Sequence, residues 1–214
     1  MNKTGLVLLL NFIIFSFYLL NAQEFYKFKC DITIKEKPDS LSFNLYKGYL
    51  EFDRLQNISM YHFYFPLMEQ WIVTSDSLIK MRNGSRVFAE KMQLMHNYTV
   101  FNLFLNGSLK NYGLSNSKFE IAKVTDLGNS EIETTWIPPP SLKATYGKII
   151  ISQKNDRLNG VAIFDTNNSL ITKQIYTNYI KVSNLYFPAK IFYIYYLLGA
   201  EQYKIIEFSH IVLE

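Results

Sequence analysis

The residues able to perform chemistry are few in this sequence and lie far apart. The 214-residue chain has one cysteine, Cys30, and three histidines, His62, His96 and His210. A single cysteine forms no internal disulfide, and none of the histidines has a cysteine or another histidine at metal-ligand spacing. These residue types exclude a disulfide scaffold and a zinc finger, and we predict neither a metal site nor a cofactor.

Common catalytic motifs are also absent, since the sequence has no nucleophile elbow, phosphate loop, dinucleotide fingerprint or zinc-protease motif. Asp126, Glu131 and Glu133 are close in sequence, but a solvated strand edge explains them better than an acid–base pair. Cys30 follows the apolar face of a strand, where a free cysteine usually packs as core. A lipid-modifying hydrolase would need a nucleophile with a base in reach, which no spacing supplies. We therefore predict no catalytic residue and no enzyme.

One cation has an unusual position. Within Gly48–Arg54, strand alternation places Leu50, Phe52 and Arg54 on one face, so a charge ends an apolar stripe. Burying such a charge is costly unless it finds hydrogen-bond acceptors. Two interpretations follow. Arg54 either lies at the rim of a sheet and extends to water, or it hydrogen-bonds backbone carbonyls of a segment that covers a hydrophobic hollow.

The elements that position these residues are mostly strands. From Tyr26 to Lys35, apolar and polar residues alternate, which predicts a half-buried strand. A turn is expected at 37–40. The apolar phase then changes near Tyr46 and Lys47, which indicates a β-bulge before Gly48.

Further strands follow from the same pattern. We expect one from Ile58 to Phe65, and others at 71–74, 78–82 and 86–90, with Asn83-Gly84 as a type I′ hairpin turn. Later strands are expected at 119–124, 131–137, 148–153, 160–165, 170–179, 191–198 and 203–213, with a stop at Pro138.

The segment from Thr99 to Leu109 differs, because its apolar residues follow helical spacing. Gly107 suits the end of that helix. About ten strands and one or two helices, without repeats or linkers, favour one large curved antiparallel sheet with a helix over its concave side. The fold class is therefore α+β, mainly β.

Composition and the N-terminal residues indicate the class of protein and its location. The chain is 49% hydrophobic and 19% charged, which rules out disorder as its main state, and its net charge of +4 is spread out, so we predict no nucleic-acid partner. Lys3, the apolar stretch Leu6–Leu20 and the small residue Ala22 form a secretory signal pattern. We predict a signal peptide over 1–22, cleaved after Ala22, because the apolar run is short for a membrane anchor. The exported part, 23–214, is predicted to be a single domain.

The segment Gly48–Arg54, the apolar strand after it and Ser75-Asp76-Ser77 resemble the periplasmic outer-membrane lipoprotein carrier family, LolA-like, in order and spacing. The resemblance spans about 25–188. Leu55 stands where the family has a proline, and Ser77 stands where the family has the turn glycine. The resemblance implies an unclosed β-barrel with a helical lid over a hydrophobic cavity that receives acyl chains, with Arg54 matching the arginine that holds the lid.

The expected function is therefore a monomeric periplasmic carrier. It would bind acyl chains of lipoproteins, or of a related lipid, and transfer them from an inner-membrane donor complex to an outer-membrane acceptor. The alternative is a non-carrier envelope sensor or scaffold of the same fold, with its cavity filled by its own side chains. The residues expected to bind ligand, taken from alternation and from the resemblance, are Phe28, Ile32, Leu50, Phe52, Arg54, Ile58, Met60 and His62.

Overall fold

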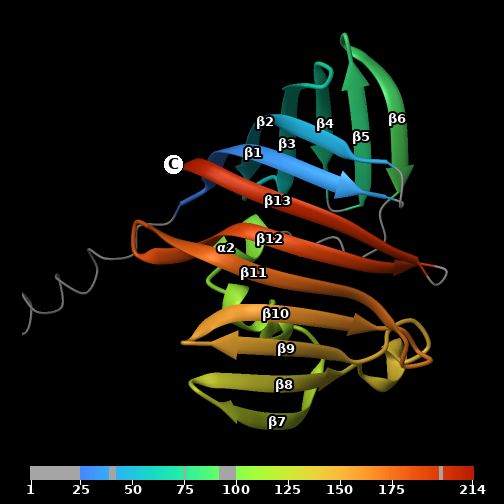
Figure 1. Ribbon diagram of the computed structural model, residues 1–214, viewed down its shortest axis with the longest axis vertical. Coiled ribbons are helices and arrows are strands. Elements are labelled where there is room, and N and C mark those ends of the chain that lie inside the picture. The colour runs from blue at the N-terminus through green and yellow to red at the C-terminus, as the bar shows by residue number, and fades with distance from the viewer. Residues whose placement is uncertain (1–24, 39–41, 75, 92–99, 198–199) are drawn as a thin grey trace, which may run out of the picture.

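The computed structural model describes residues 25–38, 42–74, 76–91, 100–197 and 200–214 (Figure 1). The predicted signal peptide lies outside these residues, as do residues 39 and 40 of the predicted turn at 37–40. The described strands are β1 (Lys27–Lys37), β2 (Asn44–Asp53), β3 (Ile58–Phe65), β4 (Glu69–Val73), β5 (Ser77–Arg82), β6 (Ser85–Lys91), β7 (Glu120–Gly128), β8 (Glu131–Ile137), β9 (Ile149–Lys154), β10 (Arg157–Phe164), β11 (Leu170–Val182), β12 (Leu185–Leu197) and β13 (Ala200–Leu213). The described helices are α2 (Val100–Leu105) and the short 3₁₀ turns η2 (Leu109–Asn111), η3 (Leu114–Asn116) and η4 (Pro140–Leu142).

All 13 described strands form one antiparallel sheet in the order β6-β5-β4-β3-β2-β1-β13-β12-β11-β10-β9-β8-β7. Adjacent strands of the sheet are also consecutive in the chain, except that β1 pairs with β13 in the middle of the sheet. The chain therefore runs outward from β1 to the edge strand β6. It then passes α2 on one side of the sheet and returns from the other edge strand, β7, to β13 (Figure 1). The predicted fold class is confirmed, and the expected number of about ten strands was too low.

Local signals account for several element boundaries. Asn83 and Gly84 both have positive φ, 50° and 74°, as a type I′ turn requires between β5 and β6. Gly107, at φ 64°, follows α2, and its amide donates to the carbonyl of Phe104. These two predictions are confirmed, as is the end of β8 before Pro138.

The predicted bulge lies beside Lys47 and Gly48, as expected, but its extra residue belongs to the neighbouring strand β3 instead of β2. Pairing between β2 and β1 is regular, whereas the β2–β3 pairing shifts between Lys47 and Gly48, which leaves Tyr64 of β3 as the extra residue. Gly48 is needed there because a Cβ would contact the backbone carbonyl of His62 and lie 2.8 Å from the Cα of Phe63.

Strand β12 begins earlier than predicted and contains Pro188, which is fully buried. Proline lacks an amide hydrogen, which argues against a position between two paired strands. The structure resolves this because β12 pairs with β11 at Tyr179–Pro188, while its pairing with β13 begins only at Lys190. Pro188 therefore has a paired strand on one side only.

Candidate functional site

The concave face of the sheet begins with β1 and β2, whose alternation matches the prediction. Phe28 pairs with Phe52, Cys30 with Leu50 and Ile32 with Gly48, and all the side chains that these pairs carry, those of every member but the glycine, are buried. Directly opposed residues of an antiparallel pair project to the same face. The structure therefore places the predicted ligand-binding residues Phe28, Ile32, Leu50 and Phe52 on the concave face.

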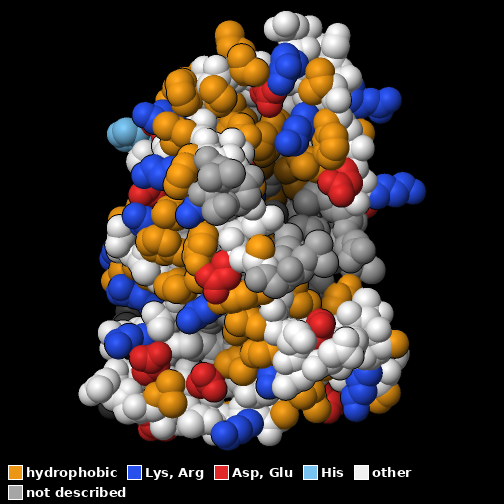
Figure 2. All heavy atoms as spheres, turned by 45° about the vertical axis from the view of Figure 1, so that its right-hand side comes forward, with side chains coloured by type: hydrophobic (Ala, Val, Ile, Leu, Met, Phe, Trp, Pro, Cys, Tyr) orange, Lys and Arg blue, Asp and Glu red, His pale blue; other side chains and the backbone are white. Residues whose placement is uncertain are grey.

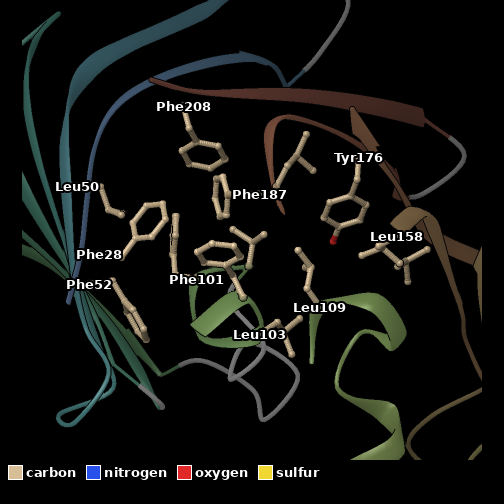
Figure 3. Close-up of a cluster of buried hydrophobic side chains, with 14 of the residues drawn as sticks. Phe28, Leu50, Phe52, Phe101, Leu103, Leu109, Leu158, Tyr176, Phe187 and Phe208 are labelled. Atoms are coloured by element: carbon tan, nitrogen blue, oxygen red, sulfur yellow. The ribbon is translucent and has the colours of Figure 1, made fainter. Parts of the chain in front are cut away.

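Helix α2 covers this face through two phenylalanines. The ring of Phe101 lies 5.0 Å from that of Phe28 and 5.5 Å from that of Phe208, centroid to centroid (Figure 3). The ring of Phe104 lies 5.0 Å from that of Phe187. The helix has only six residues, and helices this short are unstable on their own, so packing against the sheet holds it. We call the part of the concave face that this cluster of aromatic rings occupies the apolar half.

Strand β3 faces the opposite way from the prediction. Its pairing with β2 sets Ser59 opposite Phe52, Tyr61 opposite Leu50 and Phe63 opposite Gly48. The side chains on the concave face are therefore Ser59, Tyr61 and Phe63.

The predicted residues Ile58, Met60 and His62 lie on the convex face, where the His62 ring stacks on Tyr49 at 4.5 Å. The prediction failed because β3 carries apolar residues at both parities, so its sequence does not choose a face. Pairing with β2 makes that choice.

Arg54 lies one residue beyond the end of β2, so strand alternation does not fix its direction. Its amide donates to the Tyr26 carbonyl at 2.8 Å, and its side chain is half-exposed. Within the described residues its guanidinium has no hydrogen bond or ion pair. Its predicted contact with a covering segment remains a prediction.

Tyrosines line the other half of the concave face. Tyr193 opposes Lys204 of β13 and Gln174 of β11, and the ring of Tyr195 lies parallel to that of Tyr193 at 6.0 Å. Lys204 forms an ion pair with Glu36 at 2.8 Å. Burial raises the pKa of the Tyr193 and Tyr195 hydroxyls, so both stay protonated. This polar half was not predicted from the sequence, and it combines side chains of the consecutive strands β11, β12 and β13 with Glu36 of β1.

The hollows on the described surface include the following two. One, of about 220 Å³, lies beside α2 and is lined by residues that include Phe104, Leu109, Leu158 and Arg157. The other, of about 300 Å³, is lined by Glu36, Pro38, Tyr195, Gln202, Tyr203 and Lys204. Ligand pockets typically measure about 300–1,000 Å³, so both hollows are small. Figure 2 shows hydrophobic side chains gathered with Lys and Arg over the upper part of the molecule, which β2–β6 form in Figure 1.

Groups for covalent or metal chemistry are sparse in this site. Cys30 is buried, and burial raises the pKa of its thiol, which keeps it in the unreactive protonated form. Across the described ranges, no three His, Cys, Asp or Glu side chains come close enough to hold a metal ion. Within the same ranges, no helix has the length and apolar character needed to cross a membrane. The described site therefore offers surface for binding more than groups for reaction.

Comparison with known proteins finds structural likeness without close sequence relatives. No family model matches the sequence, and no curated protein matches it. Solved structures that resemble most of the chain include three from different bacteria. A LolA superfamily protein from Nitrosomonas europaea superposes with a TM-score of 0.59 at 13% identity, covering 88% of this chain and 86% of that one.

The other two structures have higher TM-scores. A DUF1329 family protein from Desulfovibrio piger gives 0.64 at 9% identity, covering 90% of this chain and 87% of its own. A domain named as an outer-membrane lipoprotein-sorting protein, from Vibrio parahaemolyticus, gives 0.64 at 10% identity, covering 94% and 91%. At such identities the likeness concerns the fold, and the chain has the LolA-like fold, an open curved antiparallel sheet with a short helix on its concave side.

Proposed function

We propose that residues 23–214 form a periplasmic carrier that binds acyl chains between the concave face and α2. The cargo would be a lipoprotein or a related lipid, received from an inner-membrane donor and passed to an outer-membrane acceptor by transient contacts of a monomer. The observation that supports this most is the way α2 closes the apolar half, by aromatic packing from a six-residue helix. Because α2 is held on the sheet by the packing of its side chains, another apolar group can take the place of those side chains.

The free energy gained by burying the α2 side chains is similar to the free energy gained by burying an acyl chain. Four side chains of α2 are buried, namely Val100, Phe101, Leu103 and Phe104. Burying each is worth about 1.5–3 kcal/mol, or about 6–12 kcal/mol together. An acyl chain with about 14 methylenes gains about 11 kcal/mol on full burial, at about 0.8 kcal/mol each. An acyl chain can therefore displace the helix, and the helix can return when the chain leaves.

The LolA-like fold and the lipoprotein-sorting domain among the similar structures support the same proposal. They also support a binding role without catalysis, and the periplasm as its location. Arg54, a half-exposed residue just beyond the end of β2, is proposed to stabilise the closed cover by donating hydrogen bonds from its guanidinium.

A scaffold or sensor of the envelope is the second candidate. It is favoured by the close packing around Phe101, because the α2 side chains already fill the apolar half without a ligand. The two candidates differ in whether that half ever opens for a lipid.

Native mass spectrometry tests the carrier. The chain is exported in a bacterium with an outer membrane, purified from the periplasm, and measured before and after organic extraction. We expect an acylated species that extraction removes. Only bare polypeptide, with no uptake of added lipoprotein or lipid, would favour the scaffold.

Arg54→Leu tests the role of the arginine. We expect it to change the rate at which bound lipoprotein is released to an acceptor membrane. Arg86→Leu, at an exposed position on the edge strand β6, is the matched control and is expected to leave release unchanged. Equal release by both variants would reduce Arg54 to a residue of the sheet rim.

A further inference from the structure

The concave face is polar over one part that an acyl chain would not need. We call this part the tyrosine trough and define it by Tyr61, Thr172, Tyr193 and Tyr195; the hollow of about 300 Å³ lined in part by Tyr195, Glu36 and Lys204 borders it. The register places Thr172 opposite Tyr195 and Tyr193 opposite Lys204, so these side chains share the concave face. Tyr61 is near enough to Tyr193 to affect its titration.

Thr172 gives the strongest sign of an absent ligand. Thr172 is 8% exposed, and its hydroxyl oxygen is buried with no hydrogen-bond partner in the described part of the chain. A buried hydroxyl without a partner lowers stability relative to an apolar side chain of the same shape. Its neighbour on the same face, Gln174, is satisfied, since it donates to the Tyr112 hydroxyl at 3.2 Å and accepts from Tyr176. The Thr172 hydroxyl therefore lacks a hydrogen bond within the described residues, although its neighbours on the same face of β11 have theirs.

The charges at the tyrosine trough favour some lipid headgroups over others. Glu36 and Lys204 neutralise each other at 2.8 Å, and the groups that define the trough are neutral hydroxyls and aromatic rings. Raised pKa values keep the hydroxyls of Tyr61, Tyr193 and Tyr195 neutral. Because Glu36 and Lys204 already pair with each other, the groups that define the trough offer a phosphate or an ammonium group no unpaired charge, whereas rings and hydroxyls can pack against and hydrogen-bond a polyhydroxylated group.

We propose that the cargo is an amphiphile whose neutral, hydroxyl-bearing headgroup binds in the tyrosine trough while its acyl chain occupies the apolar half. This rests on the proposed carrier function and narrows its cargo. The headgroup would be enclosed with the chain, so a glycolipid-like molecule fits better than a lipoprotein, whose polypeptide must remain outside.

Three probes with one tail test this inference on the full exported chain. Dodecyl maltoside, dodecyl sulfate and dodecyltrimethylammonium are titrated below their micellar concentrations, with binding followed by calorimetry. We expect dodecyl maltoside to bind at least about tenfold tighter than either charged probe. Equal affinities would overturn the inference while leaving the carrier function standing. Tighter binding of dodecyl sulfate would also overturn it. Failure of all three probes to bind, together with bare polypeptide in the native spectrum, would overturn both.

Two variants locate the headgroup. Thr172→Val and Tyr195→Phe each remove one hydroxyl, and each should weaken dodecyl maltoside binding by about 3- to 10-fold, as expected for one hydrogen bond, without changing the other probes. Tyr196→Phe is the matched control, because Tyr196 is the next residue of β12 and projects to the opposite face.

Thr172→Val has a second readout that does not need a ligand. Removing an unsatisfied hydroxyl should leave the thermal midpoint of the ligand-free protein unchanged or raise it. A clear fall in that midpoint would mean that the hydroxyl is bonded in the free protein, and would overturn the argument from Thr172.

Discussion

Phe101→Ala tests whether α2 is part of the packed core. Phe101 is 2% exposed, and its ring has four aromatic neighbours, Phe28, Phe52, Phe187 and Phe208, with centroids 5.0–6.1 Å away. Truncating a buried phenylalanine to alanine costs about 3–5 kcal/mol, because the transfer energy and the cavity both count. We expect a loss of about 4 kcal/mol, which a domain with about 5–15 kcal/mol of stability survives.

Urea unfolding followed by circular dichroism measures this loss. The midpoint should fall while the slope stays constant, since the same surface is exposed on unfolding. The control is Phe43→Ala, because Phe43 is 76% exposed and its truncation should cost less than about 0.5 kcal/mol. A loss below about 1 kcal/mol for Phe101→Ala would refute the packing that we describe.

Ligand binding gives an independent check of the same change. A cavity lined only by apolar side chains stays dry and accepts small apolar molecules. Benzene should therefore raise the thermal midpoint of the Phe101→Ala variant and leave the unmodified protein unchanged. If the variant loses about 4 kcal/mol and benzene still stabilises neither protein, no enclosed apolar cavity lies beneath α2, and α2 does not seal the concave face in the manner proposed.

Three further predictions follow from particular side chains. Gly48→Ala should cost about 2–3 kcal/mol or more in urea unfolding, since its Cβ would meet the β3 backbone at His62, whereas Gly160→Ala, whose Cβ would lie 3.3 Å from the Gln174 carbonyl, should cost less. The hydrogen bond from Lys35 and the contact with Lys190 hold the pKa of Glu207 below its usual 4.5, so stability should be present above pH 4.5 and fall as the pH drops towards the lowered folded value. Unfolding curves across that range would show this, and an unchanged pH dependence in Glu207→Gln would contradict it. The Cys30 thiol is buried with a raised pKa, so iodoacetamide at pH 8 should label it slowly in the native protein and quickly in urea, and fast native labelling would show that the β1–β2 core opens readily.

The sequence alone determined the features that depend on near neighbours along the chain. Strict alternation placed Phe28, Cys30 and Ile32 on one face of β1, and the structure agrees. Asn83-Gly84 and Gly107 marked a turn and a helix end because few other residues adopt positive φ. The apolar helical spacing at 99–109 located α2, since that period does not occur in a strand.

Only the tertiary structure decided the features that depend on distant residues. Strand β3 has apolar residues at both parities, so its face was fixed by pairing with β2 and not by its own pattern. The tyrosine trough joins β3 with β11, β12 and β13, and the rings around Phe101 include Phe187 and Phe208 from the C-terminal strands. Alternation along a strand predicts which side chains share a face. Register and strand order determine which residues those side chains contact. Register and strand order depend on pairings between distant segments, such as β1 with β13.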